Sequence, residues 1–367
     1  MKRRHQNIRL RIATIVGARP QFIKAATLSR VLRSTLDVEE VLVHTGQHYD
    51  ENMSKIFFEE LDVPLPKYNL GIHSTRHGSQ TGRMLEAIEA TLTELRPNCV
   101  LVYGDTNSTL AGALAAAKLH IPVAHVEAGL RCFNRRVPEE INRICTDHVS
   151  DFLFAPTETA VRNLLTEGIS PQRIHRAGDV MYDAALFYGS KASLDGLLPG
   201  VEANHYVLAT IHRAENTDNL ERLSAIMEGL ALVAGEVPVV LPLHPRSRAA
   251  VEQSGRPPQS KHLHVIEPVG YLKMIALEKS ARLIVTDSGG VQKEAFFYRV
   301  PCVTLRDQTE WVELVEMGWN VVVPPISASA VAEAIFANLD RRGREGAPYG
   351  DGAAAQAIAT VLCTAFQ

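Results

Sequence analysis

The segment Ser288-Gly289-Gly290 has the composition of a turn that binds phosphate. It follows the apolar run Leu283–Thr286 and precedes a helical pattern over residues 291–298. Glycines let backbone N–H groups come close to a phosphate, and a helix start adds unpaired donors and a favourable dipole. Glu294, about one helical turn further on, could accept hydrogen bonds from ribose hydroxyls. The alternative is that Ser288 only caps the helix and the glycines only make a tight turn.

Two cations follow another apolar run. Arg19 and Lys24 come after Gly17, at which the run 11–16 ends, and they flank the expected start of a helix. Two fixed cations at this place suit a pyrophosphate or a carboxylate. The alternative is that both side chains are solvated surface residues.

Three carboxylates also come close to strand ends or helix starts. Asp105 and Glu127 follow the apolar runs 100–104 and 123–126, and Glu139 precedes a helical pattern. Acids gathered at one sheet edge can transfer protons, because burial and mutual repulsion raise some of their pKa values. As structural alternatives, Asp105 could cap a helix, Glu139 could favour its helix dipole, and Glu127 could pair with Arg131 or Arg143.

Two histidines, His212 and His244, end apolar runs in the second half of the chain. A histidine at a strand end can act as an acid, a base or a phosphate ligand, although a single one is more often structural. The other histidines lack the close spacing of a zinc site and no cysteine joins them, so no metal site is predicted.

The elements that must position these residues alternate along the chain. Short β-branched runs alternate with longer amphipathic stretches, the pattern of βαβ units around parallel sheets. We therefore predict an α/β protein with two Rossmann-like domains. The expected boundaries are residues 1–185 for the domain with the acid and base residues, 186–350 for the second domain, and 351–367 for a final helix that packs back on the first domain.

Composition excludes several classes of protein. The chain has 367 residues and a net charge of −3, which describes an ordinary globular protein and predicts no nucleic-acid partner. No stretch reaches the roughly 18 apolar residues of a membrane span, so a cytoplasmic enzyme without a membrane partner is expected. The five cysteines are scattered, and reduced, mostly buried thiols are expected.

Taken together and in order, the motifs resemble those of the non-hydrolysing UDP-N-acetylglucosamine 2-epimerase family. The resemblance covers nearly the whole chain, through Gly17-Ala18-Arg19-Pro20, Gly104-Asp105-Thr106, His125-Val126-Glu127-Ala128-Gly129-Leu130-Arg131, Pro138-Glu139-Glu140-Ile141-Asn142-Arg143, His212-Arg213, Thr286-Asp287-Ser288-Gly289-Gly290 and Arg306-Asp307-Gln308-Thr309-Glu310. It implies a GT-B-like fold with a central cleft, and it suggests a homodimer.

The resemblance also implies a reaction. UDP-N-acetylglucosamine and UDP-N-acetylmannosamine would interconvert by loss of the C2 proton and anti elimination of UDP to a 2-acetamidoglucal, followed by re-addition. No cofactor is required. The implied catalytic residues are Asp105, Glu127, Glu139, His212 and Lys24. The implied substrate-binding residues are Arg19, Arg143, His244, Tyr271, Ser288, Gly289, Gly290, Glu294 and Arg306.

Departures from the family pattern bear on the substrate. Gln21 stands where many members have Glu, Tyr49 where many have Arg, and Trp311 where Arg is commoner. The missing Arg at position 49 argues against activation by a second UDP-sugar. The variants resemble the branch acting on UDP-2,3-diacetamido-2,3-dideoxyglucuronate, which is the alternative substrate. A GT-B glycosyltransferase is the alternative from another class, because the same fold and diphosphate turn serve both reactions.

Overall fold

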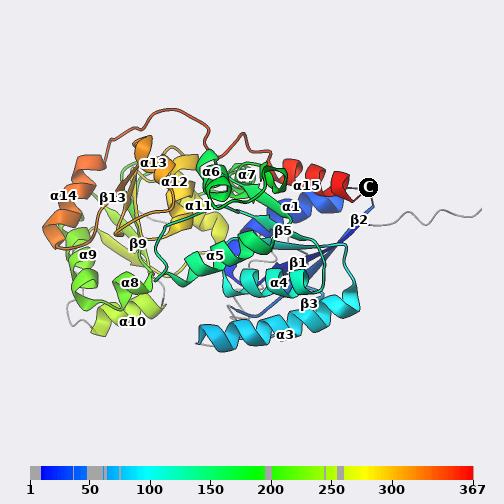
Figure 1. Ribbon diagram of the computed structural model, residues 1–367. Coiled ribbons are helices and arrows are strands. Elements are labelled where there is room, and N and C mark those ends of the chain that lie inside the picture. Colours follow the sequence, from blue (N-terminus) through cyan, green and yellow to red (C-terminus); the bar gives the residue numbers. More distant parts are fainter. Residues whose placement is uncertain are drawn as a thin grey trace, which may run out of the picture. The chain divides into compact units, whose positions relative to one another are not determined.

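The computed structural model describes residues 10–35, 37–47, 61, 64–73, 76–194, 201–243, 245–253 and 260–366. The chain forms two compact units. Unit 1 comprises Met1–Ala184 and Ala347–Gln367, and unit 2 comprises Ala185–Gly346. Each unit contains a parallel sheet with helices along the chain between its strands (Figure 1), which confirms the predicted α/β fold class.

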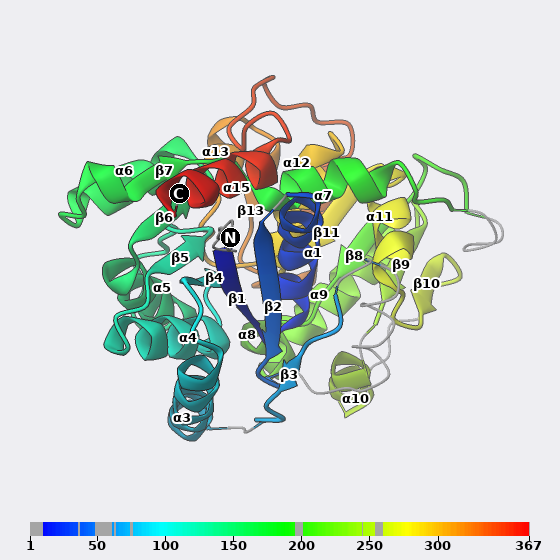
Figure 2. The same cartoon turned by 90° about the vertical axis from the view of Figure 1, so that its right-hand side faces the viewer.

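Unit 1 is built on a parallel sheet with the strand order β3-β2-β1-β4-β5-β6-β7. The strands are β1 (Leu10–Val16), β2 (Val38–His44), β3 (Tyr68–Asn69), β4 (Cys99–Tyr103), β5 (Val123–Val126), β6 (Phe152–Ala155) and β7 (Ile174–Arg176). The helices are α1 (Arg19–Ser34), α3 (His77–Leu95), α4 (Asn107–Lys118), α5 (Pro138–Val149), α6 (Glu158–Thr166) and α15 (Ala354–Ala365), and helix α7 (Val180–Gly189) begins in unit 1 and ends in unit 2. The strand order reverses at β1, and Figure 2 shows β1 between β2 and β4. Such a reversal favours a ligand site beyond the carboxyl ends of β1 and β4.

The returning helix α15 belongs to unit 1. Its first N–H groups, those of Ala354 and Ala355, donate to the Asp183 carboxylate at 3.1 and 2.8 Å. A helix start leaves such donors without partners inside the helix, so Asp183 acts as its cap from a distant part of the chain. Helix α15 lies against α1 (Figure 1) and buries Ile358 and Leu362.

Unit 2 contains a parallel sheet with the order β10-β9-β8-β11-β12-β13. The strands are β8 (Val207–Thr210), β9 (Val239–Pro242), β10 (Leu263–Ile266), β11 (Leu283–Thr286), β12 (Cys302–Thr304) and β13 (Asn320–Val322). The helices are α8 (Ala214–Thr217), α9 (Leu220–Val233), α10 (Pro245–Gln253), α11 (Tyr271–Lys279), α12 (Gly289–Phe297), α13 (Val312–Glu316) and α14 (Ala328–Asn338). The order again reverses near the first strand of the unit, here β8.

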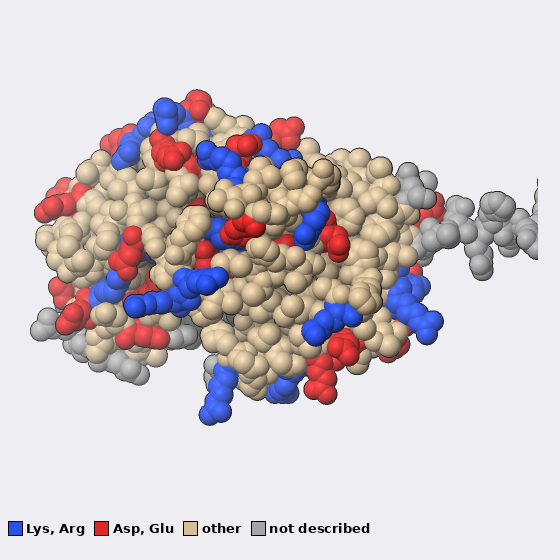
Figure 3. Space-filling view, viewed as in Figure 1, with Lys and Arg blue, Asp and Glu red and all other residues tan. Residues whose placement is uncertain are grey.

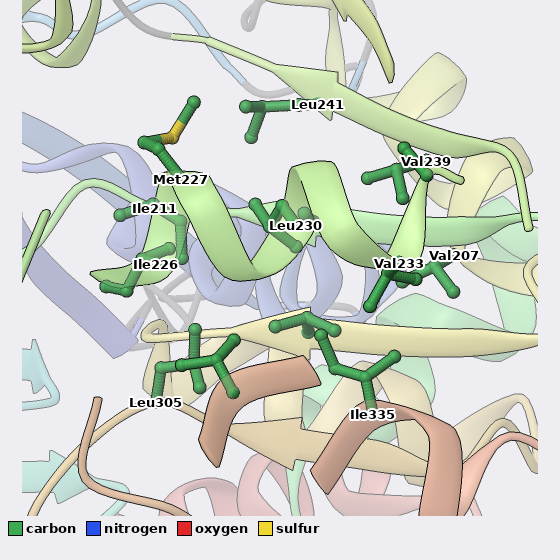
Figure 4. Close-up of a cluster of buried hydrophobic side chains, with 14 of the residues drawn as sticks. Val207, Ile211, Ile226, Met227, Leu230, Val233, Val239, Leu241, Leu305 and Ile335 are labelled. Atoms are coloured by element: carbon green, nitrogen blue, oxygen red, sulfur yellow. The ribbon is translucent and has the colours of Figure 1, made fainter. Parts of the chain in front are cut away.

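Replacing Leu230 in the core of unit 2 should strongly reduce the free energy of unfolding. Leu230 of α9 is completely buried among Val207, Val239 and Ile335 (Figure 4). Leu230→Ala should lower the free energy of unfolding by about 3 kcal/mol, because it removes buried methyl groups and leaves a cavity. Leu232 on the same helix is 55% exposed and provides the matched control. Urea unfolding of Leu232→Ala should differ from wild type by less than about 0.5 kcal/mol, and equal losses in both variants would contradict this packing.

The composition led to expectations about surface charge, membrane spans and cysteine burial, which can be compared with the structure. On the face shown in Figure 3, acidic and basic side chains are interspersed. None of the described helices is both long and apolar enough to cross a bilayer.

All five cysteines are free, as expected, but only Cys99 and Cys302 are buried, and Cys145 is exposed. The expectation of mostly buried thiols was therefore wrong, because Cys132 and Cys363 are only partly buried and Cys145 is exposed on α5.

Candidate active site

Two strand ends in unit 1 have an unusual backbone. Gly104, after β4, and Glu127, after β5, both adopt left-handed conformations, with φ of 63° and 74°. The Gly104 N–H donates to the carbonyl of Val126 at 3.0 Å, which joins the two ends. A Cβ atom on Gly104 would lie 3.2 Å from Lys24 Nζ and 3.3 Å from Glu127 Oε2. Glycine therefore accommodates both the backbone conformation and the close approach of these two side chains.

Lys24 and Glu127 form a buried ion pair. Lys24 reaches from α1, and its Nζ donates to Glu127 Oε2. Both side chains are at least nine-tenths buried. Glu127 thus has the Lys24 ammonium group as a partner, while Arg131 and Arg143 bind Asp147 and Asp105. The pair places a carboxylate and an ammonium group together beside the end of β4.

Asp105 lies beside this pair and binds Arg143, with 2.5 Å between Asp105 Oδ2 and Arg143 Nη1. Burial raises the pKa of Asp105 above its usual range. The charges of Glu127 and Glu139 also raise this pKa, whereas Arg143 and Lys24 oppose the shift. Since 34% of the side chain is exposed, the carboxyl group is still within reach of a ligand. Asp105 does not cap α4 as the alternative proposed, because Thr106 accepts the N–H bond of Thr109 at that helix start.

The neighbours of Asp105 include two residues that sequence reasoning missed. Glu140 accepts hydrogen bonds from Arg143 Nε and Nη2 at 3.0 and 2.7 Å, which fixes the guanidinium group. Gln21 accepts from the N–H groups of Gly17 and Ala18 and donates to the Tyr103 carbonyl at 2.9 Å, so it joins the start of α1 to the end of β4. The i, i+3 spacing of Glu140 and Arg143 was a usable signal for the first contact.

Other predicted residues of unit 1 are placed as follows. Glu139 is exposed in the first turn of α5. Arg19 is the first residue of α1. The structure thus brings Lys24, Asp105, Glu127 and Arg143 together, with Glu139 close enough for its charge to affect Asp105.

The glycine turn of unit 2 lies at the start of α12. Ser288 occupies the N-cap position, but its side chain makes no capping hydrogen bond, so the alternative of a hydroxyl cap was wrong. The Ser288 N–H donates to Thr286 Oγ1 at 3.0 Å, which fixes the end of β11. A Cβ atom on Gly289 would lie 2.6 Å from Glu310 Oε1. The other oxygen of Glu310 accepts from Arg306 Nη1 at 3.0 Å.

His212 follows β8 and is oriented by the fully buried Asp287. The Asp287 carboxylate accepts from the N–H groups of His212 and Arg213 at 3.1 and 3.0 Å, and from Asn216 Nδ2 at 3.1 Å. His212 Nδ1 lies 3.4 Å from Asp287 Oδ1, and 53% of the His212 side chain is exposed. The imidazole is therefore held on one side and accessible on the other. Sequence reasoning did not assign Asp287 this role.

Tyr271 and Glu294 meet in the interior of unit 2. The Tyr271 hydroxyl donates to Glu294 Oε1 at 3.3 Å, and both side chains are buried. Burial raises the pKa of Tyr271 well above its usual range, and the charge of Glu294 contributes. His244 and the variant residue Tyr49 lie outside the described residues. In the described part of the chain, no group of three or more His, Cys, Asp or Glu side chains is arranged to hold a metal ion.

Comparison with known proteins gives a consistent result. Residues 30–363 match the family model for UDP-N-acetylglucosamine 2-epimerase. A UDP-2,3-diacetamido-2,3-dideoxy-D-glucuronate 2-epimerase of Pseudomonas aeruginosa is 52% identical over 357 residues, covering 96% of this chain and 99% of the relative. A UDP-N-acetylglucosamine 2-epimerase of Methanocaldococcus jannaschii is 45% identical, with 96% and 99% coverage. The crystal structure of the M. jannaschii UDP-GlcNAc 2-epimerase in complex with UDP-GlcNAc and UDP is similar, with a TM-score of 0.89, 44% identity and 96% and 99% coverage.

Proposed function

The chain belongs to the UDP-N-acetylglucosamine 2-epimerase family, as its motifs predicted, and we propose that it inverts C2 of a UDP-linked 2-acetamido sugar. It is thus an isomerase. The observation that supports this reaction best is the meeting of Asp105, whose pKa is raised, with the Lys24–Glu127 pair at neighbouring strand ends. This arrangement supplies two carboxyl groups in different environments, as a reaction that removes one proton and delivers another requires.

The proposed reaction has two balanced halves. A carboxylate takes the C2 proton, the C2–H electron pair forms a C1–C2 double bond, and the C1–O bond breaks with departure of UDP. In the second half UDP adds back to C1 and a proton is delivered to the other face of C2. Asp105, Glu127 and Glu139 are the proposed proton-transfer groups, and no redox step occurs. Lys24 and Arg143 keep positive charge close to these acids.

Unit 2 supplies the proposed binding groups for UDP. The first N–H groups of α12, at Gly289 and Gly290, suit the diphosphate because a helix start binds anions. His212 presents an accessible ring at the end of β8, and Glu294 is proposed to accept from the ribose. We also assign Arg19, His244, Tyr271 and Arg306 to UDP-sugar binding, on the family resemblance.

One prediction tests the diphosphate turn directly. Gly289→Ala should weaken UDP binding about tenfold, or about 1.4 kcal/mol, because the new methyl group would displace Glu310 and crowd the helix start. Gly82→Ala is the control, since a Cβ atom there meets nothing within 4 Å. Titration calorimetry with UDP should show wild-type affinity for the control. Equal affinity in Gly289→Ala would exclude the turn as the phosphate site.

Two sugars are candidates for the substrate. UDP-N-acetylglucosamine is favoured by the M. jannaschii relative and structure. UDP-2,3-diacetamido-2,3-dideoxyglucuronate is favoured by the P. aeruginosa relative, which is 52% identical over 96% of this chain, and by the departures from the family pattern at Gln21, Tyr49 and Trp311, and we propose it as the better substrate. Parallel assays of the purified enzyme with each UDP-sugar should give the larger kcat/KM for the uronate. Faster turnover of UDP-N-acetylglucosamine would reverse this order.

Heavy water distinguishes epimerisation from glycosyl transfer. An epimerase incubated with its UDP-sugar and no acceptor should incorporate deuterium at C2 and form the manno product, both visible by proton NMR. A glycosyltransferase requires an acceptor and does not exchange the C2 proton. Absence of exchange and of manno product with both sugars would reject the proposed reaction.

A cytoplasmic homodimer is also part of the proposal, on the family resemblance. Light scattering of the purified protein tests the dimer.

A further inference from the structure

A completely buried histidine lies between the proposed acids of unit 1. His125 is the third residue of β5, and neither its side chain nor that of Asp147 on α5 is exposed. His125 Nδ1 lies 2.7 Å from Asp147 Oδ1, and His125 Nε2 lies 2.7 Å from the Gly104 carbonyl oxygen. Both ring nitrogens therefore face oxygen atoms within hydrogen-bonding distance.

The hydrogen bonds determine the charge of this ring. A carbonyl oxygen can only accept, so His125 Nε2 must carry a proton. Asp147 binds the Arg131 guanidinium at 2.8 Å and accepts from the Gly129 N–H at 3.1 Å. Burial opposes ionisation of Asp147, but its bonds to His125 and Arg131 outweigh burial and lower its pKa. The pairing with the Arg131 guanidinium favours a carboxylate at Asp147, which places the proton between Asp147 and Nδ1 on the ring and makes His125 an imidazolium.

The backbone groups held by His125 and Asp147 lie close to Asp105 and Glu127 in the sequence. Gly104 directly precedes Asp105, and its carbonyl is held by His125. Gly129 follows Glu127 by two residues, and its N–H is held by Asp147. The histidine and its carboxylate therefore connect the turn after β4 to the turn after β5. The turn after β5 holds Glu127 in the left-handed conformation, which neighbouring contacts must maintain in a residue other than glycine.

We propose that His125 is a positioning residue for the two candidate proton-transfer groups, Asp105 and Glu127. The imidazolium does not touch the substrate. It fixes the carbonyl beside Asp105, and through Asp147 it fixes the loop that follows Glu127. The charge matters because a neutral ring would have to give up one of its two hydrogen bonds. This role concerns the arrangement of the acids and rests on the proposed function only for its kinetic consequence.

The first test does not depend on activity. In wild-type protein labelled with ¹⁵N-histidine, NMR at neutral pH should show protons on both ring nitrogens of His125. The signals are assigned as those absent from His125→Gln, and independently by their shift in Asp147→Asn. An unprotonated ring nitrogen would overturn the proposal, even if His125→Gln did not fold.

The second test separates positioning from binding. His125→Gln should lower kcat about 100-fold, the size expected for misplaced reacting groups. KM and the affinity for UDP should change less than about threefold, because the groups of unit 2 are intact. Asp147→Asn should have the same effect, and the double variant should lose no more than either single variant. A folded His125→Gln enzyme with wild-type kcat would contradict the proposal.

His148 provides a matched control. It follows Asp147 in the chain, 47% of its side chain is exposed, and its Nε2 lies 3.4 Å from Glu167 Oε2. His148→Gln makes the same chemical change outside the connection and should keep wild-type kcat. If the wild-type enzyme turned over neither UDP-sugar, the proposed function would fail, whereas the NMR result would still decide the charge of His125.

Discussion

Asp105→Asn should lower kcat by on the order of 10³-fold, because the amide can neither accept nor release the proton that C2 exchanges. The fold should become more stable at the same time. Burial raises the pKa of Asp105, so the folded protein holds this proton more tightly than the unfolded chain. The stability that this group contributes is complete below its ordinary pKa and is lost as pH rises through the raised value.

The advantage of Asp105→Asn in thermal unfolding should therefore grow as pH rises from acid. Asp340→Asn is a control with the opposite sign. A hydrogen bond from Arg282 lowers the pKa of Asp340, which is largely exposed, so the amide should leave kcat unchanged and lower stability slightly at neutral pH. An Asp105→Asn variant that is both active and less stable would contradict the assignment of Asp105 as a strained, functional acid.

Lys24→Met should lower the free energy of unfolding by about 4 kcal/mol. The substitution keeps most of the side-chain volume but leaves the buried Glu127 without its ammonium partner. Lys24→Met/Glu127→Gln removes both charges and should recover most of that loss in urea unfolding. Both variants should be nearly inactive. The double variant should therefore regain stability without regaining activity. If the double variant were no more stable than Lys24→Met, the buried charge would not be the cause.

The fold could be predicted well where apolar runs were bounded by turns. The apolar runs Val123–Val126 and Leu283–Thr286 form strands with the bounds that the sequence pattern indicates. The edge strands β3 and β7 were missed because they have only two and three residues. Segments of this length are too short to show an alternation of apolar and polar residues. Helix α7 was missed because its buried residues surround the helix rather than forming one face.

The candidate site was predictable in position but not in pairing. Parallel strands place their carboxyl ends at one edge, so Asp105 and Glu127 could be expected to be neighbours. Which cation each acid binds depends on side-chain direction across the sheet, and spacing along the chain did not indicate Lys24 as the partner of Glu127. Glu127 has a left-handed backbone, and its carboxylate binds Lys24, which lies 103 residues away in the sequence. A left-handed conformation at a residue other than glycine cannot be predicted reliably from a single sequence.

Unit 1 has a consequence for synthesis on the ribosome, because its two stretches of chain are separated by the whole of unit 2. At about 10 residues per second, the roughly 160 residues of unit 2 take about 16 seconds to make before α15 can follow. Throughout that interval the nascent chain has the Asp183 carboxylate without the two N–H groups it will cap. The surface of α1 that α15 will cover is also open to chaperones. Completion of the unit that carries Asp105 and Glu127 is thus a late event, which follows the synthesis of all of unit 2.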